Sequence, residues 1–252
     1  MVVALALAVA VLLLGPLAVF AFGDLTPGSS WRVASRAPLG LAPDPAVDRE
    51  PIVQVYGART LGWRGAFAIH TWIATKRADA DDWRSHHVIG WRVWRGGSGV
   101  VSQTGAPDFS WFGARPQLLA ERRGTEVEGT IDRIEAAVED WPYARSYRAW
   151  PGPNSNTFTA FVARAVPELE LDLPANAIGK DFLGGARVLD RLPSGTGWQV
   201  SLLGLAGLSI GRTEGIEANL LGLSFGIDPG DRALRLPGIG RWPAASGAVA
   251  AP

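Results

Sequence analysis

The chain contains no cysteine, which excludes disulfides, thiolate metal sites and thiol nucleophiles, so the fold depends on its packed core. An excess of charge of one sign is also absent, because 24 Lys and Arg residues balance 24 Asp and Glu residues. Without clustered basic charge, we expect no nucleic-acid partner. With three His residues and no nucleotide-binding motif, we expect neither a metal nor a cofactor.

Charged residues are missing from residues 1–22, a run made mainly of Val, Ala, Leu and Phe. About 20 apolar residues are enough to cross a bilayer core as a helix. Two interpretations remain open. One is a retained anchor, which the length favours, and the other is a signal peptide cleaved before Asp24. Either one predicts that the rest of the chain faces the periplasm or the exterior, and the retained anchor predicts a protein of the bacterial inner membrane.

The chain divides into segments of different composition. After the signal peptide or membrane anchor at residues 1–23, residues 24–50 are rich in Pro, Gly and Ser without a period and predict a linker. Residues 51–192 have strand patterns followed by helix patterns and predict one α+β domain. Residues 193–242 predict a Gly/Leu-rich β-hairpin extension, and residues 243–252 predict a disordered tail.

The strand patterns come first within the predicted domain. Apolar and polar residues alternate in short runs, which predicts an antiparallel meander of strands at residues 52–56, 66–76, 87–94 and 100–104.

The helix patterns follow. Thr125 and Glu128 have the spacing of a capping box before an apolar stripe that ends at Pro142. A second helix is expected to begin at Ser155 or Asn156 and to end at Pro167.

The tetrapeptide Leu-Leu-Gly-Leu occurs at residues 202–205 and again at residues 220–223. Repeated Gly disfavours a helix by about 1 kcal/mol each, so we predict two packed strands joined by a tight connection. A surface that lies on a bilayer is the alternative. Both segments are too short to span one.

A hydroxyl group stands at the predicted start of the second helix, where Ser155 follows the Pro-Gly-Pro loop at residues 151–153. Free backbone N–H groups at Ser155 and Asn156, together with the helix dipole, suit a developing negative charge. Ser and Asn are also favoured N-caps, so a purely structural role for Asn154 or Ser155 is the alternative interpretation.

Two short motifs resemble those of circularly permuted papain-like hydrolases, a group that includes NlpC-like and deSUMOylating isopeptidase-like enzymes. Residues 154–158 (Asn-Ser-Asn-Thr-Phe) resemble the helix-opening Asn-Cys-Asn-x-Phe motif, and residues 69–73 (Ile-His-Thr-Trp-Ile) resemble the strand with the catalytic His. The resemblance implies an antiparallel sheet packed on helices. It also implies hydrolysis or acyl transfer on an amide or ester, with Ser155 as nucleophile and His70 as base.

The chain departs from that pattern because Ser155 stands where those enzymes have Cys, and a hydroxyl forms no anion beside an imidazole. A catalytically inactive envelope module that binds a peptide, glycan or lipid is therefore the alternative. Candidate substrate-binding residues flank the two motif residues: Asn154, Asn156, Trp72 and Trp150. The alternative role for each Trp is to fill the hydrophobic core. His87 is either a second imidazole near His70 or a core or surface residue.

Over most of its length the chain resembles an uncharacterised bacterial family, domain of unknown function 3750. The stretches that carry this resemblance are residues 150–158, 177–181 and 193–197. The family implies no established activity.

Overall fold

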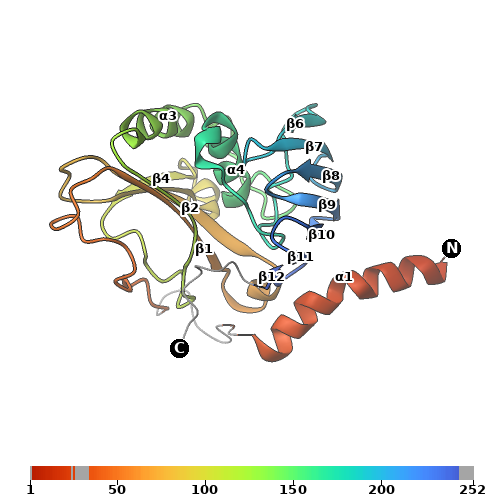
Figure 1. The fold of residues 1–252 in the computed structure, drawn as a ribbon. Coiled ribbons are helices and arrows are strands. Elements are labelled where there is room, and N and C mark those ends of the chain that lie inside the picture. Colours follow the sequence, from red (N-terminus) through yellow and green to blue (C-terminus); the bar gives the residue numbers. More distant parts are fainter. Residues whose placement is uncertain (1, 24, 26–33, 244–252) are drawn as a thin grey trace.

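The computed structural model describes residues 2–23, 25 and 34–243, with the backbone alone described at residues 2–9. Two antiparallel sheets form the body of the protein (Figure 1). Helix α4 (Ser155–Ala165) lies between them and is hydrogen-bonded to side chains of both. Strands precede helices in the first part of the chain, so the mixed class predicted from the order of the patterns is confirmed.

The first sheet has five strands, all antiparallel to their neighbours. Its two central strands are paired along their whole length, from Ile52 opposite Lys76 to Arg59 opposite Ile69. Nearly every residue of both is buried, the polar residues Gln54, His70 and Thr71 included. In spatial order the strands are β4 (Val100–Thr104), β3 (Arg84–Val88), β2 (Ile69–Lys76), β1 (Ile52–Arg59) and β5 (Gln117–Arg123).

Helices cover one face of this sheet. α3 (Val127–Glu139) and α4 present an apolar stripe each, and Ile131 and Phe158 meet Ile73 of β2 in one buried cluster. Burying such side chains is worth about 1.5–3 kcal/mol each, so this cluster supplies much of the stability of the domain.

The chain itself covers the other face of the first sheet. Residues from Ala34 onward lie against a second cluster that contains Tyr56, Trp72 and Trp83. The Trp83 indole donates to the Pro43 carbonyl at 3.1 Å. The described part of the segment predicted as a linker therefore closes the core, and residues 24 and 26–33 of that segment lie outside the described residues.

Several local predictions differ from the structure. The run at residues 87–94 was predicted as one strand, but β3 ends at Val88 and a short helix, α2 (Gly90–Trp94), follows. The predicted capping box does not form, because α3 has no side-chain cap. The Glu128 carboxylate instead accepts a hydrogen bond from Arg77, the residue after β2, at 3.1 Å, because a charged donor binds a carboxylate more strongly than a backbone N–H does.

The second sheet is a meander of seven antiparallel strands rather than the single hairpin predicted for residues 193–242. Each strand pairs with the next along the chain, so the spatial order equals the sequence order. The strands are β6 (Leu189–Arg191), β7 (Gly197–Leu202), β8 (Ala206–Gly211), β9 (Gly215–Leu220), β10 (Leu223–Asp228), β11 (Ala233–Leu236) and β12 (Gly240–Trp242).

The repeated Leu-Leu-Gly-Leu segments form two tight turns of this meander. Leu203 and Gly204 have φ of 55° and 74° in the β7–β8 turn, and Leu221 and Gly222 have φ of 53° and 77° in the β9–β10 turn. Two successive positive φ values define the hairpin turn whose twist matches that of the strands, which is why Gly recurs there. The prediction of strands at these two segments was therefore wrong, because the segments are the turns between strands rather than the strands themselves.

Helix α1 (Val2–Phe22) projects away from the body, as Figure 1 shows. Within its described side chains, Leu12 and Val19 are buried. Gly15 lies so close to the β11–β12 turn that a Cβ would meet the Pro237 carbonyl oxygen at 2.1 Å. Among the described residues, we find no helix of the length and apolar character needed to cross a membrane. Asp24, before which cleavage was predicted, and residues 244–252 of the tail predicted at residues 243–252 lie outside the described residues.

Candidate functional site

His70 lies in the middle of a buried aromatic cluster. Its ring stacks on Trp111 with centroids 3.7 Å apart and planes 3° apart, and its Nε2 lies 3.1 Å from Nδ1 of His87. Burial, and then the neighbouring imidazole, lower the pKa of His70 well below its usual value, and burial lowers the pKa of His87 to about 3. The structure therefore holds two neutral imidazoles in one hydrogen bond, with His87 as the second imidazole near His70.

Ser155 is the first residue of α4 and is also buried. The cap of this helix is Asn154, whose side-chain oxygen accepts from the backbone N–H groups of Asn156 at 2.9 Å and Thr157 at 3.1 Å. The Thr157 hydroxyl in turn accepts from the Asn154 N–H at 3.1 Å, which completes a capping box. The helix start predicted at Ser155 is confirmed.

The sheet separates His70 from Ser155. The Thr71 hydroxyl donates to the Asn156 side-chain oxygen at 3.0 Å and lies 2.9 Å from the Thr159 hydroxyl, so Thr71 points toward α4. Successive side chains of a strand point to opposite faces, and His70 accordingly meets Trp111 on the other side. Among the described residues, no hydrogen bond joins His70 to Ser155.

The predicted substrate-binding residues have structural contacts. The Asn154 amide donates to the Ala149 and Ile178 carbonyls at 3.0 Å each. Asn156 donates to the Ile69 carbonyl at 3.0 Å and to the Ile178 carbonyl at 2.8 Å. Asn156 thus holds α4 against β2, and both side chains hold it against the loop that contains Ile178. Their hydrogen-bonding capacity is engaged within the fold.

The two tryptophans differ from each other. Trp72 is fully buried, stacks on Phe109 with centroids 4.7 Å apart and donates to the Pro107 carbonyl at 2.7 Å. Trp150 is half exposed, and its indole donates to the Leu221 carbonyl at 2.8 Å. Trp72 is therefore a core residue, and Trp150 links the loop before α4 to the second sheet.

Metal ligands do not gather around these histidines. His86, next to His87 on β3, faces α3, and its Nδ1 lies 2.8 Å from the Ser102 hydroxyl. Burial lowers the pKa of His86 to about 4. Within the described part of the chain, we find no cluster of three or more side chains arranged to hold a metal ion.

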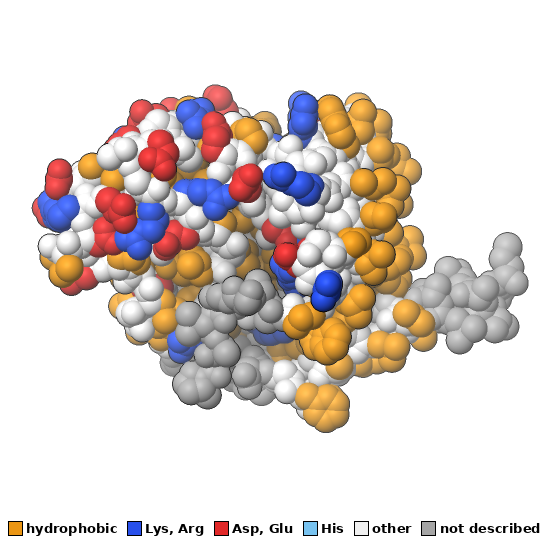
Figure 2. All heavy atoms as spheres, in the orientation of Figure 1, with side chains coloured by type: hydrophobic (Ala, Val, Ile, Leu, Met, Phe, Trp, Pro, Cys, Tyr) orange, Lys and Arg blue, Asp and Glu red, His pale blue; other side chains and the backbone are white. Residues whose placement is uncertain are grey.

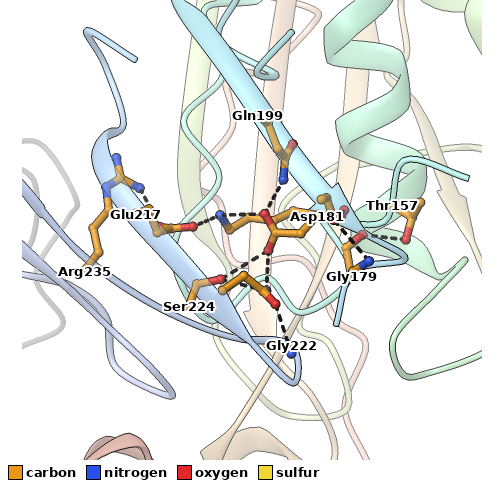
Figure 3. Close-up of polar contacts among 12 residues, drawn as sticks. Thr157, Gly179, Asp181, Gln199, Glu217, Gly222, Ser224 and Arg235 are labelled. Atoms are coloured by element: carbon orange, nitrogen blue, oxygen red, sulfur yellow. Dashed lines mark hydrogen bonds and ion pairs between the residues drawn. The ribbon is translucent and has the colours of Figure 1, made fainter. Parts of the chain in front are cut away.

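A buried polar network lies between α4 and the inner face of the second sheet (Figure 3). Lys180 forms an ion pair with Glu217 of β9. Although burial lowers it, the carboxylates of Asp181 and Glu217 raise the pKa of Lys180, so its ammonium stays charged. The Asp181 carboxylate accepts from Gln199 at 2.5 Å, from Asn219 at 2.8 Å and from Ser224 at 3.2 Å.

Arg235 of β11 extends the network across the sheet. Its side chain is 0% exposed, its Nη2 lies 2.5 Å from a carboxylate oxygen of Asp172, and its Nη1 lies 3.7 Å from a carboxylate oxygen of Glu217. The cavity beside Lys180 and Asp181 has a volume of about 10 Å³, room for one water at most. The network therefore binds the second sheet to the domain and leaves no room for a substrate.

A shallow pocket of about 330 Å³ opens beside this network. It is lined by Pro167, Glu170, Arg212 and the loop at residues 194–196. Neither His70 nor Ser155 contributes to it.

The outer face of the second sheet is apolar and exposed to solvent. In Figure 2 its side chains form the band along the edge of the molecule where β6–β10 lie in Figure 1. Each is between 40% and 60% exposed. We call this set the outer face: Leu189, Trp198, Val200, Leu202, Leu208, Ile210, Ile216, Phe225, Ile227, Leu234 and Trp242.

Sequence reasoning did not identify the polar network, and it touched the outer face only through the alternative that the two Leu-Leu-Gly-Leu segments lie on a bilayer. A signal was present, because polar and apolar residues alternate in β7 (Gln199, Ser201) and again in β9 (Glu217, Asn219). This alternation is the ordinary pattern of a strand with one buried face. Alone, it does not say that the polar face is the buried one.

Comparison with known proteins identifies the family. A family described as "Protein of unknown function (DUF3750)" matches residues 50–182. The chain belongs to this family. Neither the curated proteins nor the solved structures contain a match.

The DUF3750 match includes the first sheet, α3, the capped start of α4 and the Lys180–Asp181 pair. Two of the three stretches that carry the resemblance, residues 150–158 and 177–181, lie within it, and the third, residues 193–197, lies beyond it. The strands of the second sheet also lie beyond the matched residues. The comparisons do not show the papain-like resemblance.

Proposed function

We propose that this protein is a non-catalytic binding module of the bacterial cell envelope, and that it binds through the outer face. One observation carries the proposal, namely that a whole face of a seven-stranded sheet consists of exposed apolar side chains. Contiguous apolar surface on this scale is typical of an interaction site, because water contact with it is unfavourable.

An envelope location is supported by the apolar surface of α1. In its described part, Val11, Leu14, Leu17 and Phe20 are each at least 60% exposed. We propose that the protein resides at the inner membrane, with the folded body toward the periplasm or exterior. Of the three ligand classes, peptide, glycan and lipid, the outer face favours an apolar one, because it has few groups able to bind sugar hydroxyls.

A Ser155–His70 hydrolase on a permuted papain-like fold is the second candidate. The order of the two motifs and the N-terminus of α4 support it. The arrangement of the two side chains argues against it, because Thr71 rather than His70 faces α4 and because His70 is stacked on Trp111. A base must reach the proton that it removes, within about 3 Å or through one water.

Sedimentation with washed cell envelopes tests binding through the outer face. The full chain is compared with Leu208→Ser/Ile216→Ser, which changes two outer-face residues, and with Val47→Ser, which removes an exposed apolar side chain elsewhere. We expect the outer-face variant to bind at least about tenfold more weakly, equivalent to ~1.4 kcal/mol, and Val47→Ser to bind like wild type. The series is repeated with Leu14→Lys/Leu17→Lys, which removes the contribution of α1.

Equal sedimentation of wild type and Leu208→Ser/Ile216→Ser in both backgrounds would contradict the proposal. A serine-reactive fluorophosphonate tests the second candidate. Labelling of wild type but not of Ser155→Ala would establish the hydrolase instead.

A further inference from the structure

The outer face is organised as rows of side chains that run across the sheet, and the first row extends from β7 to the edge strand β12. The register places Trp198 opposite Ile210, Ile210 opposite Ile216, Ile216 opposite Ile227, and Leu234 opposite Trp242. Val200 and Leu208 begin a second, parallel row. Side chains that face one another across strands in this way form one smooth apolar surface without a charged residue inside it.

The register fixes this orientation. Gln199, Glu217 and Arg235 alternate with the outer-face residues and are buried on the inner face. A shift of the strand register by one residue would turn every apolar side chain inward and the charged side chains outward. This shift is disfavoured because it would break the ion pairs of Lys180 and Arg235. The apolar surface is therefore a fixed feature of the fold.

Two turns extend the apolar surface. Leu203 and Leu221 occupy positions with positive φ, where an L side chain other than Asn or Gly is disfavoured. Both leucines are more than half exposed. In water about half of the surface of each of these side chains remains exposed. In an apolar medium each leucine would be buried.

Helix α1 continues the surface. It projects from the side of the molecule that carries the outer face, as Figures 1 and 2 show, and its described side chains Val11, Leu14, Leu17 and Phe20 are exposed. A protein partner would have to fit both a helix and a sheet. A bilayer presents the same apolar environment to the helix and to the sheet, and lipid tails can fill the uneven surface between the two elements.

The rim of the surface resembles a membrane interface. The first row begins at Trp198 and ends at Trp242, and the Arg191 guanidinium lies 4.6 Å from the centroid of the Trp198 ring. Trp and Arg favour the boundary between acyl chains and water, since each has an apolar body and a polar end.

We propose that the partner of the outer face is a lipid bilayer, and that the second sheet lies flat on it beside α1. This inference rests on the proposed function and names its ligand. The contact is hydrophobic, so it forms on uncharged phosphatidylcholine and persists at high salt, where attraction between charges is screened.

Quenching of tryptophan fluorescence by vesicles of brominated phosphatidylcholine tests the inference. α1 contains no Trp and gives no quenching of its own, so the loss of quenching in a variant without the two sheet tryptophans measures the contribution of the sheet. We expect wild type to be quenched and Trp198→Phe/Trp242→Phe to lose most of that quenching. Trp94→Phe, which changes an exposed Trp on α2, should retain it.

The outcomes separate this inference from the proposed function. If the protein binds envelopes through the outer face but Trp198 and Trp242 are not quenched by brominated lipid, the inference of a bilayer partner is overturned. The partner is then a protein or a glycan. Failure of both experiments would overturn both proposals. Concentration-dependent dimerisation of the lipid-free chain that is abolished by Leu208→Ser/Ile216→Ser, without quenching by lipid, would assign the outer face to a second copy.

Discussion

The two sheets of this protein bury opposite kinds of side chain. In the five-stranded sheet, Ile73 faces the helices and Trp72 faces the other core, so apolar residues are buried on both sides. In the seven-stranded sheet, Glu217 and Arg235 are buried and Ile216 is exposed. Both sheets use the same alternation of side chains. The difference teaches that the alternation of residues in a strand defines a polar and an apolar face, whereas the neighbouring elements decide which of the two faces is buried.

The two sheets therefore depend on different forces. Removal of apolar surface from water stabilises the first. Hydrogen bonds and ion pairs hold the second on the domain, and these are favourable only when every buried group has its partner. We expect the second sheet to be more sensitive to the loss of one charge, and the first to be more sensitive to the loss of apolar volume.

The largest effect is expected from Lys180→Met. It leaves Glu217 and Asp181 buried without their ammonium partner, which should lower the free energy of unfolding by about 3–5 kcal/mol in urea denaturation. The double variant Lys180→Met/Glu217→Gln should be closer to wild type, because no unpaired Glu217 charge remains. Arg133→Met, which removes an exposed ion pair to Glu168, should cost less than about 1 kcal/mol.

Truncation of matched isoleucines compares the two sheets directly. Ile73→Ala creates a cavity in the first core and should lower the free energy of unfolding by about 2–5 kcal/mol. Ile216→Ala removes a side chain that is 48% exposed and should change it by less than about 1 kcal/mol. Equal losses in thermal or urea unfolding would show that the outer face is packed in water, against the comparison drawn here.

Acid should act on the first sheet. His86 and His87 have pKa values lowered to about 4 and about 3, below the value near 6.5 of an unfolded chain. The unfolded state therefore binds more protons in this window, so stability is complete above about pH 6.5 and falls as the pH drops, by up to ~1.4 kcal/mol per pH unit for each His. His87→Asn should flatten that slope in urea unfolding between pH 6.5 and 4, and an unchanged slope would contradict the assignment.

The smallest effect concerns the turns of the second sheet. Leu203→Asn places a residue that tolerates positive φ in the β7–β8 turn and should raise the free energy of unfolding by up to about 1 kcal/mol. The same change removes apolar surface and should weaken binding to vesicles. A gain in stability together with unchanged binding would exclude the turn leucines from the bilayer contact.

Much of the domain could be predicted locally. The alternation of apolar residues predicted β1 and β2, and the Asn-Ser-Asn-Thr run predicted the start of α4, because a cap is decided by a few neighbouring residues. To predict whether His70 meets Ser155, one must know which residues of β2 face α4. The local sequence does not give this, because α4 is distant in the chain. Thr71, the next residue, has the contact with α4 that was predicted for His70.

The sequence by itself determined the central strands β1 and β2, the capped helix, the absence of thiol chemistry and the resemblance to the family to which the chain belongs. These follow from composition and from interactions between residues close in the chain. Only the tertiary structure decided which face of each sheet is covered. The positions of Lys180 and Asp181 draw the polar face of the meander inward, since a buried charge needs partners that only distant strands supply. The apolar face is consequently left outside.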